Sequence, residues 1–148
     1  VTIVIIVTII VAHTDLPRVL YSDNQRRKGD IYSVKFHQDG SHLITGSYDC
    51  SVCLYDVETG ALLKRFNGHT ASVCSVTFSD VLGNMIITGS KDHTIKFWDM
   101  SSGQCVRTLT QHLGEVTSVD VMKNNANGHL LLSCSKDSSF ALWSMTES

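Results

Sequence analysis

The chain contains 148 residues, of which 43% are hydrophobic, and its formal net charge is −2. This length and composition suffice for one compact domain with a core, and a single proline argues against a disordered chain. Because no overall positive charge would attract phosphates, we expect neither nucleic acid nor a membrane surface as a partner. The five cysteines are odd in number and lie within apolar runs, which predicts reduced thiols and a cytoplasmic or nuclear location.

Residues 1–28 stand apart from the rest of the chain. Residues 1–12 are almost all Val, Ile and Thr, a composition that favours a strand. This run is too short to cross a membrane as a helix, which needs roughly 20 residues, and it lacks the basic leader and cleavage site of a signal peptide. With a turn near Thr14 and Asp15 and a strand around 18–21, the segment is interpreted as a remnant of a preceding repeat. A strand added to an open sheet edge, a truncated membrane segment and an artefact of gene prediction are the alternatives.

One pattern then recurs three times. It reads Gly-Ser-Tyr-Asp at 46–49, Gly-Ser-Lys-Asp at 89–92 and Cys-Ser-Lys-Asp at 134–137, and each copy is followed six residues later by Tyr or Trp. Both the aspartates and the aromatic residues recur after 43 and then 45 residues. A fixed period in this range indicates a repeat architecture, in which one unit of a few strands or helices is stacked several times.

Each repeat predicts short strands joined by tight turns. Apolar residues alternate with small polar ones at 73–78, and dipeptides such as Asp39-Gly40 and Thr59-Gly60 mark turns. In chain order, the expected strands are 31–36, 42–45, 51–55 and 61–66, then 73–78, 85–88, 94–98 and 104–109, then 116–121, 129–133 and 138–143. We therefore predict repeats at 29–66, 67–110 and 111–148, of which the last lacks its fourth strand.

These motifs resemble the WD-repeat β-propeller family over about residues 29–145. The middle repeat carries the markers Gly68-His69, Gly89-Ser90, Asp92 and Trp98-Asp99. The first repeat departs from the family pattern, with Arg27 or its neighbours in place of Gly-His and Tyr55 in place of Trp, and the third has Gln111-His112 and Ser144. The resemblance implies an all-β fold: a partial propeller of about three four-stranded antiparallel blades, the last lacking its outer strand.

The residues His69, Ser90 or Thr88, and Asp92 could be read as a hydrolase triad of base, nucleophile and acid. A catalytic site has no reason to recur in every repeat, however, and the His–Asp pair does recur. The resemblance implies instead a buried hydrogen-bonded network that stabilises each blade, formed by His69, Thr88, Ser90, Asp92 and Trp98, and by His112, Asp137 and Trp143. We therefore expect no catalytic residue and no enzyme activity.

Metal and cofactor sites also lack support in the sequence. Cys50 and Cys53 have Cys-x-x-Cys spacing, but we expect them to bracket a strand, where residues three apart point to opposite faces. No second pair lies at zinc-finger spacing, and no glycine-rich phosphate loop leads from a strand into a helix. The sequence therefore predicts no metal and no cofactor.

Partner binding is expected at the blade end where the corners and the loops between blades meet. The resemblance places three contact positions per blade there: Asp30, Tyr32 and Tyr48; Ser72, Cys74 and Lys91; and Glu115, Thr117 and Lys136. Tyr32 and Tyr48 are the leading anchors, because tyrosine buries a large area at low entropic cost and keeps a hydrogen-bonding tip. The alternative is that both are ordinary exposed tyrosines.

The sequence therefore predicts a non-enzymatic scaffold that binds a peptide or protein on the loop face and supports assembly of a multiprotein complex. A substrate-recognition subunit of a catalytic complex, such as a ubiquitin ligase or a histone-modification complex, is the second hypothesis. Propellers have about four to eight blades, so three repeats cannot close a ring. We expect the full-length chain to be longer, with more blades, or an oligomer to complete the ring.

Overall fold

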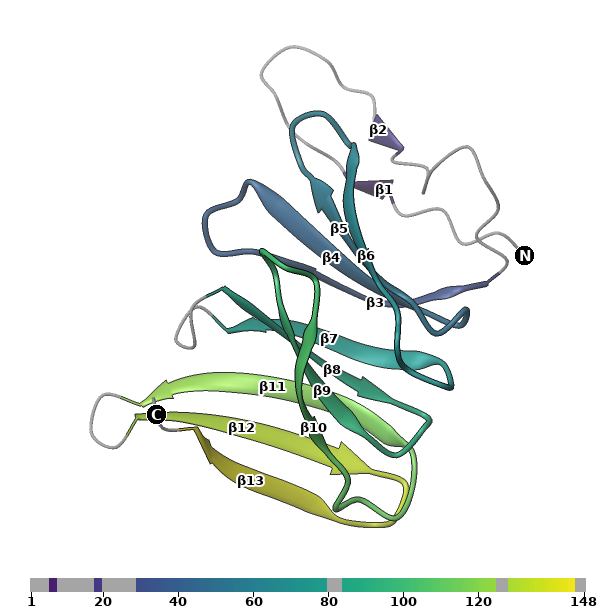
Figure 1. Cartoon of the computed structure of the whole chain (residues 1–148), viewed down its shortest axis with the longest axis vertical. Coiled ribbons are helices and arrows are strands. Elements are labelled where there is room, and N and C mark those ends of the chain that lie inside the picture. Colours follow the sequence, from purple (N-terminus) through teal and green to yellow (C-terminus); the bar gives the residue numbers. More distant parts are fainter. Residues whose placement is uncertain (1–5, 8–17, 20–28, 80–83, 125–127, 146–148) are drawn as a thin grey trace.

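The computed structural model describes residues 6–7, 18–19, 29–79, 84–124 and 128–145. All regular structure in these residues is β-strand, arranged in antiparallel sheets of four, four and three strands and a short pair, β1 (Ile6–Val7) with β2 (Arg18–Val19) (Figure 1). The predicted all-β fold, a partial propeller whose last blade lacks its outer strand, is confirmed for this part of the chain. No helix among the described residues is long and apolar enough to span a membrane.

Each sheet is a meander in which strands adjacent in sequence pair with each other. The first sheet has the order β3-β4-β5-β6, the second has β7-β8-β9-β10 and the third has β11-β12-β13. Their bounds are β3 Ile31–Phe36, β4 His42–Ser47, β5 Val52–Asp56, β6 Leu62–Phe66, β7 Val73–Ser79, β8 Met85–Ser90, β9 Ile95–Asp99, β10 Cys105–Leu109, β11 Val116–Asn124, β12 Gly128–Ser135 and β13 Phe140–Met145.

Five strands begin one or two residues later than predicted, and three of them, β5, β9 and β13, directly follow a corner. β5 begins at Val52 rather than Ser51, and β13 begins at Phe140 rather than Ser138. Ser138 has φ of 68°, a left-handed conformation that ends regular pairing. Ser51 belongs to the corner because its N–H donates to Asp49 Oδ1 at 3.1 Å. The corners are thus one or two residues longer than the hydrophobic pattern indicates.

In the N-terminal segment, Ile6 pairs with Val19 and Val7 with Arg18. The predicted turn near Thr14 and Asp15 lies outside the described residues. The interpretation of residues 1–28 as a remnant of a preceding repeat, and the assignment of the three repeats as domains, stay predictions.

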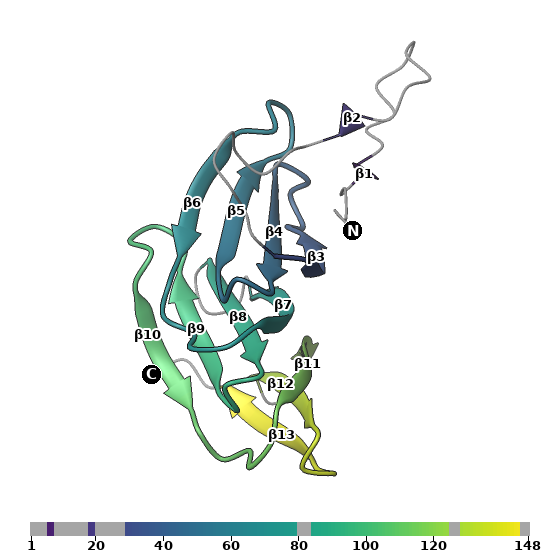
Figure 2. The same cartoon turned by 90° about the vertical axis from the view of Figure 1, so that its right-hand side faces the viewer.

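The three sheets are stacked with β3, β7 and β11 along one edge, and β6 and β10 along the other (Figure 2). Serine hydroxyls connect the neighbouring strands of that first edge: Ser33 Oγ accepts the N–H of Val76, and Ser75 Oγ accepts the N–H of Val119, each at 3.1 Å. Both serines recur at one repeat position, so each sheet is aligned on the next by the same contact.

Glycine allows the sheets to approach closely. A Cβ atom on Gly46 in β4 would lie 2.8 Å from Val73 Cγ1, and one on Gly89 in β8 would lie 2.7 Å from Val116 Cγ1. Both distances are below van der Waals contact, so any larger residue would push the neighbouring sheet away.

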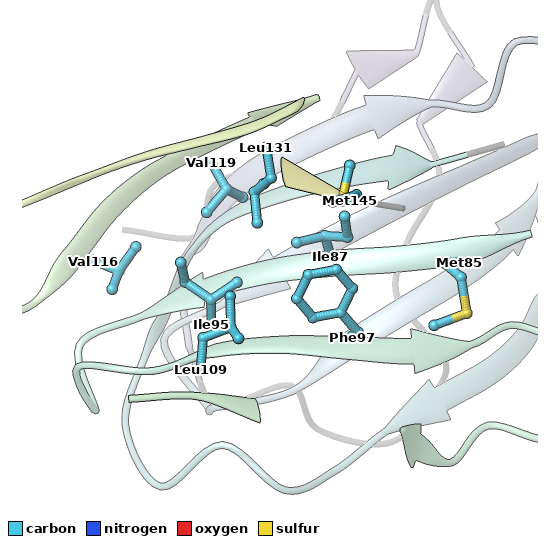
Figure 3. Packing of buried hydrophobic residues seen from close by; sticks show 9 residues of the cluster. All are labelled: Met85, Ile87, Ile95, Phe97, Leu109, Val116, Val119, Leu131 and Met145. Atoms are coloured by element: carbon cyan, nitrogen blue, oxygen red, sulfur yellow. The ribbon is translucent and has the colours of Figure 1, made fainter. Parts of the chain in front are cut away.

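Two apolar cores fill the spaces between the sheets. The core between the first and second sheets includes Ile44, Phe66 and Trp98. The core between the second and third sheets consists of Ile87 and the other residues labelled in Figure 3. β8 is buried at every position, as expected for a strand covered on both faces. Each buried aliphatic or aromatic side chain stabilises the stack by about 1.5–3 kcal/mol.

The close approach predicts the effect of adding one methyl group. Gly89→Ala should reduce the free energy of unfolding by about 1–3 kcal/mol, because the new Cβ overlaps Val116 Cγ1. Urea denaturation of the single variants and of the Gly89→Ala/Val116→Ala double variant measures the coupling. The double variant should be less destabilised than the sum of the two singles, and strict additivity would contradict the contact.

Candidate functional site

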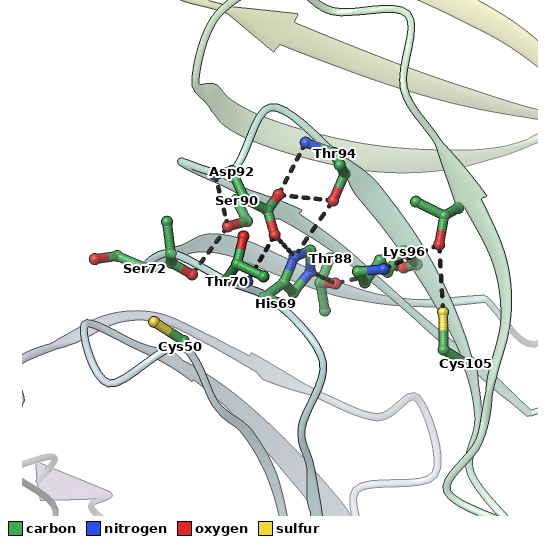
Figure 4. A network of polar contacts seen from close by, with 12 residues as sticks. Cys50, His69, Thr70, Ser72, Thr88, Ser90, Asp92, Thr94, Lys96 and Cys105 are labelled. Atoms are coloured by element: carbon green, nitrogen blue, oxygen red, sulfur yellow. Dashed lines mark hydrogen bonds and ion pairs between the residues drawn. The ribbon is translucent and has the colours of Figure 1, made fainter.

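A chain of buried hydrogen bonds crosses the second sheet. Trp98 Nε1–H donates to Thr88 Oγ1 at 2.9 Å, and Thr88 Oγ1 is 2.7 Å from His69 Nε2. His69 Nδ1 lies 2.7 Å from Asp92 Oδ2, at the corner between β8 and β9 (Figure 4). Ser90 joins the network because its Oγ accepts the N–H of Asp92 at 3.1 Å. The loop before β7 is thereby attached to the middle of the sheet.

Asp92 accepts hydrogen bonds on both carboxylate oxygens. Thr94 donates its N–H and its hydroxyl to Oδ1, and the N–H of Thr70 donates to Oδ2. Burial acts to raise the pKa of Asp92, but the hydrogen bonds with His69 and Thr94 outweigh it and hold the pKa well below its usual range. Asp92 is therefore ionised in the folded protein at neutral pH.

The third sheet repeats this chain of bonds. Trp143 Nε1–H donates to Ser133 Oγ at 2.9 Å, Ser133 Oγ is 2.8 Å from His112 Nε2, and His112 Nδ1 is 3.1 Å from Asp137 Oδ2. Ser133 was not among the residues singled out from the sequence. Its alignment with Thr88 in the repeat is the signal that would have found it.

The corner of the first sheet differs from the other two. Asp49 Oδ2 accepts a hydrogen bond from Arg65 Nη2 on β6 at 2.9 Å, and Tyr55 is buried where the other sheets have Trp. Arg27, at the position of the loop histidine, lies outside the described residues. The first sheet thus stabilises its corner with a cation from its own outer strand.

The cysteine pair in this sheet is arranged differently from our expectation. Cys50 lies in the corner with φ of 68°, while Cys53 lies within β5 and is buried. The prediction that the two bracket a strand is therefore wrong. All five cysteines of the chain are free thiols.

The His–Asp networks are poor candidates for chemistry. Both ring nitrogens of His69 have hydrogen-bonding partners. His69 is 7% exposed and Thr88 is 0% exposed. A substrate could not reach the Thr88 hydroxyl without displacing Trp98. What this arrangement can do is satisfy buried polar groups, each of which would cost about 1–3 kcal/mol if it had no partner.

At the loop face, one backbone hydrogen bond in each sheet joins the corner to the start of the inner strand. The residue before each corner aspartate donates its N–H to the carbonyl of the residue just before β3, β7 or β11, at 2.8–2.9 Å: Tyr48 to Asp30, Lys91 to Ser72, and Lys136 to Glu115. Six of the nine residues predicted to contact a partner are therefore held together in pairs.

Aromatic and charged side chains from two sheets meet on this face. The rings of Tyr32 and Tyr48 are edge-to-face, with centroids 6.3 Å apart, and Lys91 Nζ lies 5.3 Å from the centre of the Tyr32 ring. The two tyrosines are 42% and 54% exposed. Ser72 is buried and its hydroxyl donates to the Tyr48 carbonyl at 3.3 Å, so it positions Tyr48 rather than offering a free surface.

The remaining predicted positions lie on β7 and around the third sheet. Glu115 and Lys136 form an ion pair at 2.7 Å, which lowers the pKa of Glu115 and raises that of Lys136. Burial raises the pKa of the half-buried Cys74 thiol, so it stays neutral. Thr117 is exposed and its hydroxyl donates to the Cys134 carbonyl at 3.3 Å.

Sequence comparison identifies the repeat. A profile described as WD domain, G-beta repeat matches residues 18–56, 60–99 and 103–144. The chain belongs to the WD-repeat family. WD repeats serve generally as protein-interaction scaffolds, and the corner Asp and following Trp in the middle repeat are the family's markers.

Curated WD-repeat relatives match parts of the chain. LEC14B protein of Lithospermum erythrorhizon is 38% identical over 55 residues, which are 37% of this chain and 12% of that protein. WD repeat-containing protein VIP3 of Arabidopsis thaliana is 34% identical over 77 residues, 52% of this chain and 23% of VIP3. Pre-mRNA-processing factor 19 homolog 2 of the same plant is 37% identical over 51 residues, 34% of this chain and 10% of that protein. Each match spans less than a quarter of the relative.

The network of the second sheet predicts a pH-dependent stability. Asp92→Ala should destabilise the fold by about 3 kcal/mol at neutral pH, because His69 and two backbone N–H groups lose their acceptor. The pKa of Asp92 is lower in the folded than in the unfolded chain, so the ionised carboxylate stabilises the fold above about pH 4, and this contribution is lost as the pH falls further.

Thermal melts followed by circular dichroism at several pH values measure both effects. The difference in Tm between wild type and Asp92→Ala should be largest at neutral pH and should shrink below about pH 4. Asp120→Ala, which changes an exposed aspartate on β11, is the matched control and should alter Tm little. Equal Tm values for wild type and Asp92→Ala would contradict the structural role.

Proposed function

We propose that this WD-repeat chain is a non-enzymatic scaffold that binds a peptide or protein on its loop face. The loop face is the surface formed by the three corners and by the residues that begin β3, β7 and β11. One observation carries the proposal: the corner aspartate is the same in all three sheets, but the residue before it is a tyrosine in the first sheet and a lysine in the other two, and it is at least partly exposed in each. These residues are Tyr48, Lys91 and Lys136. Residues that only hold the blades have reason to repeat, whereas residues that recognise a partner have reason to differ.

Tyr32, Tyr48 and Lys91 form the centre of the proposed contact. Two tyrosines at right angles offer apolar area and hydroxyl groups, and they lose little side-chain entropy on binding. The Lys91 ammonium over the Tyr32 ring adds a positive charge within reach of the same partner segment. Because the corners are fixed by backbone hydrogen bonds, the surface needs little ordering when a partner binds.

The proposed role is assembly of a multiprotein complex, with no cofactor and no nucleic acid or membrane partner. A net charge of −2 supports a protein rather than a nucleic-acid partner, and five free thiols support a cytoplasmic or nuclear location. The length of the curated relatives beyond the matched segments supports a longer chain with more blades.

The loop-face proposal predicts which exposed side chains matter. Tyr32→Ala and Tyr48→Ala should each weaken partner capture at least tenfold, since hot-spot residues contribute about 2 kcal/mol or more. The full chain is used as bait in a cell extract, bound proteins are identified by mass spectrometry, and the affinity for a purified partner is measured by calorimetry.

Leu63→Ala is the matched control, because Leu63 is 48% exposed but lies on the outer strand β6, away from the loop face. Circular dichroism should be the same for all variants. A partner bound equally well by wild type and by both tyrosine variants would remove these residues from the contact.

A further inference from the structure

The turn between β3 and β4 lies at the end of the first sheet opposite its corner (Figure 1). This turn brings two histidines and an aspartate together. The N–H of His37 donates to the carbonyl of His42 at 2.9 Å, so the two residues close the hairpin. The N–H of Gly40 donates to the His37 carbonyl at 3.0 Å, and Gly40 has φ of 71°, which folds the turn back. Asp39 consequently lies between the two imidazole rings.

We propose that His37, Asp39 and His42 bind Zn²⁺ or a similar late first-row divalent metal ion. One atom from each side chain can be chosen so that all three lie within 4.8 Å of one another. His37 Nδ1 is 2.9 Å from Asp39 Oδ1, and His42 Nδ1 is 3.6 Å from Asp39 Oδ2. A tetrahedral zinc site with metal–ligand bonds of about 2.0–2.2 Å has ligand atoms roughly 3.3–3.5 Å apart. The two distances involve different oxygens of Asp39 and lie on either side of this value, so rotations of the rings and of the carboxylate are needed to complete the site.

The ligand types select the class of metal. Two imidazole nitrogens and one carboxylate oxygen suit Zn²⁺, Co²⁺, Ni²⁺ and Cu²⁺, whereas Ca²⁺ and Mg²⁺ prefer oxygen ligands only. Three protein ligands leave the fourth tetrahedral position for a water molecule.

The ligands are held in place before any metal binds. The His37 side chain is 12% exposed, and its ring contacts that of Phe78 from the second sheet edge-on, with centroids 4.8 Å apart. Asp39 Oδ1 accepts the N–H of Ser41 at 2.8 Å, which orients the carboxylate. An oriented carboxylate ligand is therefore present before a metal binds.

The surroundings also favour a cation. His42 is paired in register with Asp56 on β5, whose carboxylate accepts the N–H and hydroxyl of Thr59. The hydroxyl of Ser41 lies 2.6 Å from His42 Nδ1 and must turn away when the metal binds. The long hydrogen bond from the N–H of Asp39 to His37 Nδ1, at 3.4 Å, must also be given up when that nitrogen binds the metal.

The two histidines are not part of the repeat. The two histidine positions hold Ser79 and Met85 in the second sheet and Met122 and Leu130 in the third. A turn that contains Asp-Gly needs no flanking histidine to form, so the structural role of the hairpin does not explain the cluster. The site lies at the opposite end of β4 from the loop face, and it does not depend on the proposed function.

Isothermal titration of the full chain with ZnCl₂ tests the site. We expect one Zn²⁺ per chain, and a loss of affinity of at least about tenfold in His42→Ala and in Asp39→Asn. Asp39→Asn is the sharper variant, because its amide oxygen can still accept the Ser41 N–H and preserve the turn. His93→Asn is the matched control: His93 is exposed, lies in a corner with φ of 69°, and asparagine tolerates that conformation.

Co²⁺ distinguishes this site from binding at the free cysteines, because cobalt–thiolate bonds give an intense near-ultraviolet band that imidazole and carboxylate do not. The proposal is supported if cobalt binds without that band and if this binding is lost in both ligand variants. The circular dichroism of these variants, and metal binding by His93→Asn, should stay as in wild type. No binding at millimolar Zn²⁺, unchanged binding in His42→Ala and Asp39→Asn, or a thiolate band that accounts for the bound cobalt would each overturn it.

Discussion

Each corner of this structure depends on an aspartate whose carboxylate accepts hydrogen bonds from both of its sides. Asp92 and Asp137 fix the following corner residues with one oxygen and the loop before the inner strand with the other. Asp49 uses its second oxygen for Arg65 instead. Because the aspartate is fixed, the residue before it is also oriented. The N–H of that preceding residue donates to the carbonyl of the residue just before the inner strand. The rigidity of the loop face therefore follows from the hydrogen bonds that the corner aspartates accept.

The strand order and the corners could be predicted from the sequence because both repeat, and the period aligns a weak copy with a clear one. The exact strand starts could not, because Cys50, His93 and Ser138 adopt positive φ although none is glycine. The corner aspartate holds that conformation by accepting the N–H of the residue two positions on. In the second and third sheets it also accepts an N–H from the loop before the inner strand, which is a tertiary contact. Ser133 could have been predicted, because it aligns with Thr88 in the repeat and its hydroxyl makes the same two contacts with a histidine and a tryptophan.

The candidate site was predictable in position but not in arrangement. The resemblance placed nine residues on one face, yet the contact between Lys91 and Tyr32 joins two sheets and depends on how closely they stack. The burial of Ser72 has the same origin. His37, Asp39 and His42 drew no attention in the sequence, because their spacing matches no zinc motif. Only the hairpin, whose closing pair is His37 and His42, brings the three side chains together.

The strand β4 connects the turn that carries His37, Asp39 and His42 to the loop face that carries Tyr48. It begins at His42, next to the turn, and ends at Ser47, just before Tyr48 in the loop face. Its six residues span roughly 20 Å, and all except His42 are buried between the neighbouring strands and sheets. A strand packed in this way has a single conformation. Binding of an ion at the turn therefore cannot shift the loop face to a second conformation. Metal binding should therefore add to the stability of the sheet without changing the affinity of the loop face for its partner.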